Sequence, residues 1–314
     1  MEALVTGVAG FIGSHLAERL LKDGWNVKGI DCFTDYYDRS NKERNIEGVL
    51  KHNAFALMET RISQCDLPTL LSSADYIFHL AAQPGVRASW GKNFEMYVEQ
   101  NIMETQRLLE AAVGCRSLKK FVFASSSSVY GDAELPMSET SLLKPVSPYG
   151  VSKLAAEGLC SMYAKNLGVP TVSLRYFTVY GPRQRPDMAF YRFLESVSGE
   201  KEITLFGDGN QTRDFTFIRD ILDGTVGAAL QGREGAVYNL GGGHRVSLKK
   251  VIRIIEQTVG KPAKVKQAGN QAGDVRDTYA DTRAAEEELG YKPNFSLEQG
   301  IQLEYDWLNK IKKR

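Results

Sequence analysis

Tyr149 and Lys153 stand four residues apart, a spacing that can do redox chemistry. Four residues span about one helical turn, so the two side chains share a face if the segment is helical. A tyrosine with its ordinary pKa of about 10 is a poor base at neutral pH, but a nearby ammonium stabilises the phenolate. Together with a serine cluster at 125–128 and an N-terminal glycine motif, the pair predicts a redox site.

Gly7, Gly10 and Gly13 follow a short apolar run and precede an amphipathic helical pattern. Small residues at such a turn let the backbone approach a pyrophosphate, which meets free amides at the helix N-terminus. Asp31 ends the next apolar run, where a carboxylate accepts adenosine ribose hydroxyls and repels a 2′-phosphate. No arginine stands directly beside Asp31, so NAD is predicted rather than NADP. A structural turn and a surface aspartate are the alternatives.

Elements that position these residues follow from the hydrophobic pattern. In the first half, short β-branched and aromatic runs alternate with helical patterns, which predicts βαβ units in a parallel sheet. Expected strands, each apolar enough to be buried on both faces, are 3–6, 25–31, 54–58, 76–80, 120–125 and 171–176. Expected helices are 12–22, 94–113 and 149–166. The predicted fold is a Rossmann-like, doubly wound α/β sheet; after residue 182 the rhythm changes, which indicates a smaller second lobe.

Composition limits the class of protein. The 314 residues are 43% hydrophobic and 25% charged with a net charge of +1, which predicts a globular protein with no nucleic-acid partner. We find no basic-then-apolar leader and no run of 18 apolar residues, so neither export nor membrane insertion is expected, and the cytoplasm is predicted. Cys32, Cys65, Cys115 and Cys160 form no C-x-x-C pair, and no metal site is expected.

Five motifs occur in one order along the chain and carry a family resemblance. They are Gly7-x-x-Gly10-x-x-Gly13, His79-Leu80-Ala81-Ala82, the serine run before Val129-Tyr130-Gly131, Tyr149-x-x-x-Lys153, and the segment 175–182. In this combination the chain resembles, over nearly its full length, the extended short-chain dehydrogenases that act on nucleotide sugars. Within that family it is most similar to the UDP-glucuronate 4-epimerases, particularly through residues 181–190.

The resemblance implies a reaction. Tyr149, as phenolate, would take the proton of the sugar C4 hydroxyl while C4 hydride passes to NAD. Lys153 would lower the tyrosine pKa and bond the nicotinamide ribose, and Ser126 would bond the same C4 oxygen. The 4-keto sugar would then rotate and take hydride back on its other face. UDP-glucuronate would become UDP-galacturonate with no net redox change, so NAD would stay bound.

Ligand contacts are also implied by the resemblance. Residues 1–180, with a return segment near 214–243, would bind NAD, and residues 181–314 would mainly bind the nucleotide sugar. Arg213 and Arg276 would clamp the diphosphate, and Ala189 and Phe190 would shape the uracil pocket. Relatives often carry Asp at the position of Arg61. From this part of the family pattern, only a backbone contact of Ile62 with adenine is therefore implied. Implied cofactor contacts are Gly7, Gly10, Phe11, Ile12, Gly13, Asp31, Ile62, Leu80, Ala81, Ala82, Gln83, Asn101, Ser125, Tyr149, Lys153 and Tyr176. Implied substrate contacts are Arg87, Ser127, Ser128, Thr178, Arg185, Ala189, Phe190, Leu205, Gln211, Arg213 and Arg276.

Ser127 and Ser128 separate this chain from relatives that share the first oxidation. Dehydratases and decarboxylating synthases generally carry Glu just before Val-Tyr, and dehydratases add Asp in front. Elimination needs an acid and a base beyond Tyr149, which this stretch does not supply. We hypothesise that Ser127, Ser128 and Thr178 bond the sugar carboxylate and hold it near the ring plane, which disfavours loss of CO2. Thr178 replaces an Asn of many relatives, and mere packing is the alternative reading.

Rival functions remain open at this point. A UDP-glucose 4-epimerase or a UDP-glucuronate decarboxylase would share the fold. A non-catalytic, dinucleotide-sensing or RNA-binding Rossmann protein would be expected to have lost the Tyr149 and Lys153 pair, which is intact here. The resemblance also suggests a homodimer formed through the helices at 94–113 and 149–166.

Overall fold

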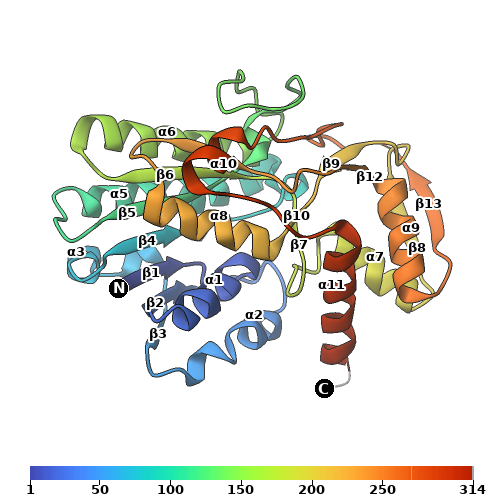
Figure 1. Ribbon diagram of the computed structural model, residues 1–314, viewed down its shortest axis with the longest axis horizontal. Coiled ribbons are helices and arrows are strands. Elements are labelled where there is room, and N and C mark those ends of the chain that lie inside the picture. Colours follow the sequence, from blue (N-terminus) through green and yellow to red (C-terminus); the bar gives the residue numbers. More distant parts are fainter. Residues whose placement is uncertain (270, 313–314) are drawn as a thin grey trace.

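Seven parallel strands form the central sheet of the computed structural model, which describes residues 1–269 and 271–312 (Figure 1). The order β11-β6-β5-β4-β1-β2-β3 runs outward in both directions from β1 and β4, as expected for a doubly wound sheet. The predicted fold class and the six predicted strands are confirmed. The strands are β1 Glu2–Thr6, β2 Asn26–Asp31, β3 Phe55–Glu59, β4 Tyr76–His79, β5 Lys120–Ser126, β6 Thr171–Tyr176 and β11 Val237–Leu240.

Helices cover both faces of this sheet (Figure 1). On one face lie α1 (Phe11–Lys22) and α8 (Ile218–Gln231), which pack against each other and against apolar strand residues. On the other lie α3 (Leu67–Leu71), α5 (Glu104–Ala112) and α6 (Pro148–Leu167). Because both faces are covered, the central strands are apolar throughout.

Helix α6 has clear start and stop signals. Ser147 caps it by accepting a hydrogen bond from the Gly150 N–H at 3.1 Å, and Pro148 occupies the first helical position. Gly168, with a φ of +68°, ends it in the left-handed conformation. This helix confirms the prediction for residues 149–166 and places Tyr149 in its first turn.

Two predictions about elements were wrong. The segment 94–113 is not one regular helix: it consists of α4 (Phe94–Tyr97), a π-helix (Val98–Met103) and α5, and it ends at Ala112. The π-helix contains Asn101, whose side chain is bonded to backbone outside the helix, a tertiary constraint that periodicity does not reveal. Strand β3 is not buried on both faces, because it is the edge strand of the sheet and Phe55, Leu57 and Met58 are only half-buried.

Helix α2 (Arg39–Ile46) packs against α1, and α10 (Arg283–Leu289) packs against α8, and the other described strands after residue 178 form three two-stranded sheets. β8 (Glu202–Phe206) pairs in parallel with β13 (Lys264–Ala268), and β9 (Thr212–Asp214) pairs antiparallel with β12 (Arg245–Ser247). β7 (Val179–Tyr180) and β10 (Thr216–Phe217) form a short parallel pair. The helices of this part are α7 (Ala189–Ser198), α9 (Leu248–Val259) and α11 (Leu297–Lys312).

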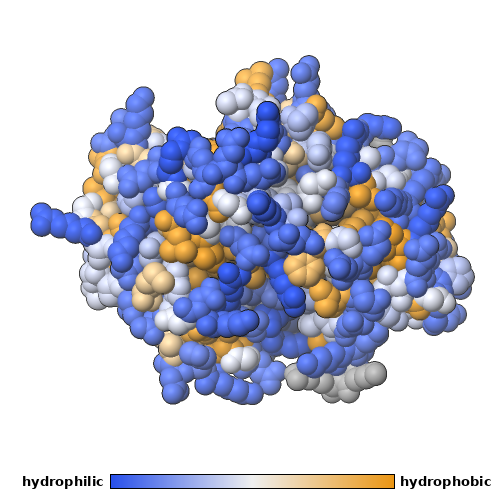
Figure 2. Space-filling view, in the orientation of Figure 1, coloured by the Kyte–Doolittle hydropathy of each residue, from blue (hydrophilic) through white to orange (hydrophobic). Residues whose placement is uncertain are grey.

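The surface is mostly polar. Figure 2 shows hydrophilic residues over most of the visible face, with apolar side chains scattered among them, which is ordinary for a globular protein. Among the described residues, no helix is long and apolar enough to span a membrane.

Candidate active site

The glycine turn joins the end of β1 to α1. Gly7 has a φ of +70°, and a Cβ atom there would lie 2.8 Å from the backbone nitrogen of Ala81. A Cβ atom at Gly13 would lie 2.2 Å from the carbonyl oxygen of Gly7. Within the described chain, no side chain caps α1 at Gly10, so its first amides and positive dipole end are free. The turn excludes larger side chains and suits a phosphate group.

Asp31 ends β2 beside this turn and is buried. Its carboxylate accepts hydrogen bonds from the backbone N–H of Ala9 at 3.1 Å and of Phe33 at 2.8 Å. Lys42 of α2 also donates to it, at 3.2 Å. The sequence reasoning checked only the immediate neighbours of Asp31 and missed this lysine, which the fold brings back from the following helix.

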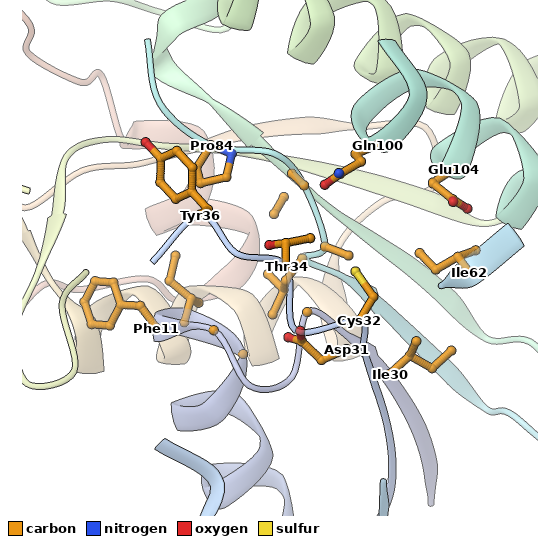
Figure 3. Close-up of a pocket in the computed structure, with 18 of the residues that line it drawn as sticks. Phe11, Ile30, Asp31, Cys32, Thr34, Tyr36, Ile62, Pro84, Gln100 and Glu104 are labelled. Atoms are coloured by element: carbon orange, nitrogen blue, oxygen red, sulfur yellow. The ribbon is translucent and has the colours of Figure 1, made fainter. Parts of the chain in front are cut away.

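A cavity of about 220 Å³ is lined both by the glycine turn and by Tyr149. Figure 3 shows Phe11, Asp31 and Tyr36 among the side chains around it. Of the sixteen residues predicted to contact the cofactor, only Gln83 and Asn101 are absent from its described lining. The lining includes Gly7, Gly10, Phe11, Ile12, Gly13, Asp31, Ile62, Leu80, Ala81, Ala82, Ser125, Tyr149, Lys153 and Tyr176, and also Arg185.

Other lining residues were not predicted. Most of them lie at or just beyond the carboxyl ends of β2, β3, β4 and β5, so strand-end position was the signal that could have found them. Gln100 and Glu104 instead come from the π-helix and α5, and Figure 3 shows Gln100 pointing into the cavity. The unpredicted lining residues are Ile30, Cys32, Thr34, Tyr36, Tyr37, Lys42, Thr60, Arg61, Pro84, Gln100, Glu104 and Ala124.

Gln83 and Asn101 lie behind the cavity wall, both buried. The Asn101 side-chain oxygen accepts from the Gln83 N–H at 2.6 Å, and its amide nitrogen donates to the Gln83 carbonyl at 3.1 Å. The same nitrogen donates to Ser152 Oγ of α6 at 2.9 Å. Asn101 thus braces the segment after β4 against the helix that carries Tyr149.

Tyr149 lies at one end of the cavity, half-buried, in the first turn of α6. Burial raises the pKa of its hydroxyl above 10.0. The donor capacity of the Ser126 hydroxyl and the charge of Arg185 act in the opposite direction and lower that pKa. Ser126 and Arg185 are therefore groups that favour the phenolate.

Lys153 lies one turn further along α6, on the same side of the cavity, and is 3% exposed. Its ammonium is 4.5 Å from the centre of the Phe123 ring. Burial lowers the pKa of Lys153 to about 8, against the opposing charges of Cys160 and Glu157. Within the described part of the chain it has no hydrogen-bonded acid, so the cation is available to a group in the cavity.

Glu157 continues the same face of α6 and anchors a buried polar network. Ser125 donates to its carboxylate at 2.6 Å, and Arg175 of β6 donates to it at 2.6 Å through Nη2. The other terminal nitrogen of Arg175 donates to Tyr130 Oη at 2.7 Å, and that hydroxyl donates to Asn239 at 2.7 Å. Sequence reasoning missed this network, which joins β5, α6, β6 and β11 beneath the site.

Ser127, Ser128 and Thr178 follow neighbouring strands at one edge of the sheet, because Ser126 pairs with Tyr176 at the ends of β5 and β6. Ser126 Oγ accepts from the Ser128 N–H at 3.1 Å and fixes the short 3-10 turn. The side chains of the three residues are half-buried and are outside the described lining of the cavity.

Arg185 is held at the cavity by Asp187. Its Nε donates to Asp187 at 2.9 Å and its Nη2 donates at 3.0 Å, a bidentate pair. Tyr36 donates to the same carboxylate at 3.3 Å, and its ring centre is 5.8 Å from the Arg185 guanidinium. The predicted substrate contact Arg185 therefore lies in the same cavity as Tyr149.

Arg87, Arg213 and Arg276 gather around the loop 273–277. Arg87 donates to Asp274 at 2.6 Å and lies 4.2 Å from the centre of the Phe206 ring. Arg213 donates to the carbonyl oxygens of Arg276, at 2.7 Å, and of Val275. Arg276 is mostly exposed, with a carboxylate of Asp208 at 3.5 Å. The fold thus collects these arginines from distant parts of the sequence into one region.

Four residues predicted to contact the nucleotide differ in burial and in hydrogen bonding. Phe190 is 1% exposed and its ring packs against Tyr180 and Phe215, so its side chain belongs to the core. Leu205 is also buried, whereas Ala189 is half-buried. Gln211 donates to the Phe206 carbonyl at 2.5 Å, and its buried side-chain oxygen has no hydrogen-bond partner among the described residues.

Comparisons with known proteins agree with this geometry. The family described as GDP-mannose 4,6 dehydratase matches residues 4–303. The chain is 46% identical to a Bacillus subtilis (strain 168) protein named uncharacterized UDP-glucose epimerase YtcB, covering 99% of both chains. It is 40% identical to the UDP-glucuronate 4-epimerase of Thermodesulfobacterium geofontis (strain OPF15), covering 97% of this chain and 95% of that one. Its structure resembles UDP-glucuronic acid 4-epimerase from Bacillus cereus in complex with UDP-glucuronic acid and NAD, with a TM-score of 0.96, 46% identity and coverage of 99% and 100%.

Proposed function

We propose that this chain, which belongs to the GDP-mannose 4,6-dehydratase family, is an NAD-dependent UDP-glucuronate 4-epimerase. The observation that carries the proposal is that Tyr149 and Lys153 line the same cavity as the glycine turn and Asp31. The solved relative from Bacillus cereus, which binds UDP-glucuronic acid and NAD, supports the choice of sugar and cofactor.

The residues of the cavity fit NAD. The close packing at Gly7 and Gly13 and the uncapped start of α1 would receive the pyrophosphate, and Asp31 would accept the adenosine ribose hydroxyls. Lys153 would bond the nicotinamide ribose, since its ammonium has no acidic partner of its own within hydrogen-bonding distance among the described residues. When bound, NAD supplies the acceptor and donor of the C4 hydride.

Tyr149 would act as base and then as acid on the C4 oxygen. The donor capacity of the Ser126 hydroxyl and the charge of Arg185 favour its phenolate, and a positively charged group bound beside Lys153 would favour it further. Returning the proton and hydride on the opposite face of the sugar gives UDP-galacturonate. The buried network of Glu157 and Arg175 holds α6 and the ends of β5 and β6 in place for this chemistry.

Ser127, Ser128 and Thr178 would hold the sugar carboxylate. Hydroxyls can bond a carboxylate without adding charge, and holding it near the ring plane limits loss of CO2 from the 4-keto sugar. These side chains would distinguish the chain from decarboxylating relatives of the same fold.

The nucleotide would extend toward the smaller lobe. Arg213 and Arg276 would bind the diphosphate, with Arg87 beside them, and the free oxygen of Gln211 offers an acceptor for a ligand N–H. In this arrangement residues 1–180 with the segment 214–243 bind the cofactor, and residues 181–314 mainly bind the nucleotide sugar.

A homodimer in the cytoplasm is also proposed. Met96, Met103, Val151 and Met162 are exposed on the helical segments 94–112 and α6, which are neighbours in the fold. Burying them against a second copy would remove apolar surface from water.

UDP-glucose 4-epimerase is the second candidate, favoured by the name of the Bacillus subtilis relative. Incubating the purified protein with UDP-glucuronate or with UDP-glucose, without added NAD, and identifying products by NMR separates the two. Turnover of UDP-glucose alone would overturn the proposed substrate, and UDP-xylose as product would overturn the proposed reaction.

A further inference from the structure

Arg183 has a backbone conformation that side chains other than glycine rarely adopt. Its φ is +67°, and it is one of three described non-glycine residues with a positive φ. It lies in the segment 181–188, which connects β7 to α7 and carries Arg185 into the cavity. Such a conformation persists only where surrounding contacts hold it, and it is often found beside functional sites.

Contacts with α1 hold Arg183 in place. Its Nη2 donates to Glu18 at 2.6 Å, and its Nη1 donates to Ser14 Oγ at 3.3 Å. The residue before Arg183 also contacts α1, because His15 Nε2 lies 2.8 Å from the Pro182 carbonyl oxygen. Burial and the charge of Arg183 lower the pKa of His15 to about 3, so this histidine is neutral and donates its Nε2 proton to that carbonyl.

The start of the segment is fixed from the other side by α11. The Gly181 N–H donates to the buried carboxyl of Glu304 at 2.9 Å. The Gln184 side chain donates to the Val179 carbonyl at 3.1 Å and accepts from the Tyr191 N–H at 3.0 Å. The backbone on either side of Arg183 is therefore clamped, and its orientation is set by two helices.

Helix α1 also borders the cavity. Phe11, Ile12 and Gly13 line it, and the ring of Phe11 makes an edge contact with His15, with centroids 6.0 Å apart. A continuous path of contacts therefore runs from the glycine turn through α1 to Arg183. Two residues later the chain returns to the cavity at Arg185, whose charge acts on Tyr149.

We propose that Arg183 is a positioning residue that ties Arg185, at the sugar end of the cavity, to helix α1 at its dinucleotide end. The inference rests on the proposed function, because it assigns Arg185 to the sugar. A loss of the Arg183 contacts with Ser14 and Glu18 releases the segment 181–188 from α1. Arg185 then loses its fixed orientation, while the glycine turn and Asp31 keep theirs.

The affinity for UDP-glucuronate, measured by calorimetric titration, tests this inference. All variants also carry Tyr149→Phe, so that binding is measured without turnover of the sugar. Arg183→Ala should raise the Kd about tenfold, in line with the cost of misplacing a contact group. In an Arg185→Ala background the same change should have no further effect, because coupled residues are not additive. Arg183→Lys, which keeps the charge, should restore part of the affinity. The amount of NAD that stays bound through gel filtration should be the same in each variant as in the protein that carries Tyr149→Phe alone.

Two further variants guard against misfolding. Arg183→Gly removes the guanidinium and relieves the left-handed backbone, and Glu18→Gln removes only the charged partner on α1; both should raise the Kd as Arg183→Ala does. An unchanged Kd in these variants, an equal loss in the Arg185→Ala background, or loss of NAD would each overturn the inference. Failure of wild-type protein to convert UDP-glucuronate would instead overturn the proposed function, since the titration does not measure conversion.

Discussion

Single residues decide how the site generates its base. The pKa of Tyr149 is raised by burial, and the opposing effects come from Ser126 and Arg185. The pattern of Tyr149 and Lys153 in the sequence was sufficient to predict the pair and its shared helical face. It could not show that Lys153 lies over the Phe123 ring, or that Arg185 acts on the tyrosine, because both depend on segments far away in sequence.

Replacing Ser126 by alanine should shift the pH dependence of kcat/KM. The Ser126 hydroxyl stabilises the phenolate, so its loss raises the pKa of Tyr149 and moves the acid limb to higher pH. Values of kcat/KM measured across the accessible pH range would check this. Ser127→Ala is the matched control, and the acid limb of its pH profile should not move. An unshifted limb in Ser126→Ala would show that this hydroxyl does not support the base.

A double change of Ser127 and Ser128 to alanine should alter the products. Without these hydroxyls the carboxylate of the 4-keto sugar is less restrained, and more UDP-pentose should be released alongside the epimer. Quantitative NMR of the nucleotide sugars gives the partition. An unchanged ratio of the two products, at any overall rate, would rule out the role assigned to these serines.

Among the elements, helix α6 has the clearest start and stop signals in the sequence. Its cap, its proline and its terminal glycine are visible in the sequence, and its limits were predicted to within one residue. The ion pair on its buried face was not predicted, because Glu157 of α6 meets Arg175 only when β6 lies beside the helix. The π-helix was missed for the same reason, since Asn101 faces a partner on another segment.

Breaking the buried ion pair should strongly destabilise the protein. Glu157→Gln leaves the Arg175 guanidinium buried without a counter-charge, and such a change costs about 3–5 kcal/mol of unfolding free energy. Urea unfolding followed by circular dichroism measures it. The exposed pair of Arg39 and Glu43 offers a control, and Glu43→Gln should barely move the midpoint. Equal midpoints for the two variants would contradict the importance of the network.

In the whole molecule, distant segments converge on one cavity. The alternation of apolar runs and helical patterns in the sequence predicted a Rossmann-like core, and the ends of its parallel strands supply most of the lining. The smaller lobe was less predictable, because its short strands lack a regular rhythm. Arg87, Arg213 and Arg276 come together around the loop 273–277, and only the folded chain shows that Arg87 bonds to Asp274 and Arg213 to backbone carbonyls.

Stability of the whole molecule should depend on pH through Glu304 of α11. Burial raises the pKa of this carboxyl well above 4.5, so the native protein keeps a proton that the unfolded chain releases. Unfolding free energy should therefore fall as pH rises above about 4.5, by about 1.4 kcal/mol per pH unit until the native pKa is reached. Glu304→Gln should remove this slope, and its stability advantage should grow with pH in urea titrations. Parallel curves for the two proteins would contradict the assignment.

The central claim is that this site inverts C4 of the sugar while sparing the carboxylate, with Tyr149 exchanging the proton of the C4 oxygen and NAD, when bound, supplying the acceptor and donor of the hydride. The most direct test is NMR analysis of UDP-glucuronate incubated in deuterium oxide with protein purified without added NAD. The account predicts UDP-galacturonate with protium retained at C4, because the hydride never exchanges with solvent. Deuterium at C4, or UDP-pentose as the main product, would contradict it.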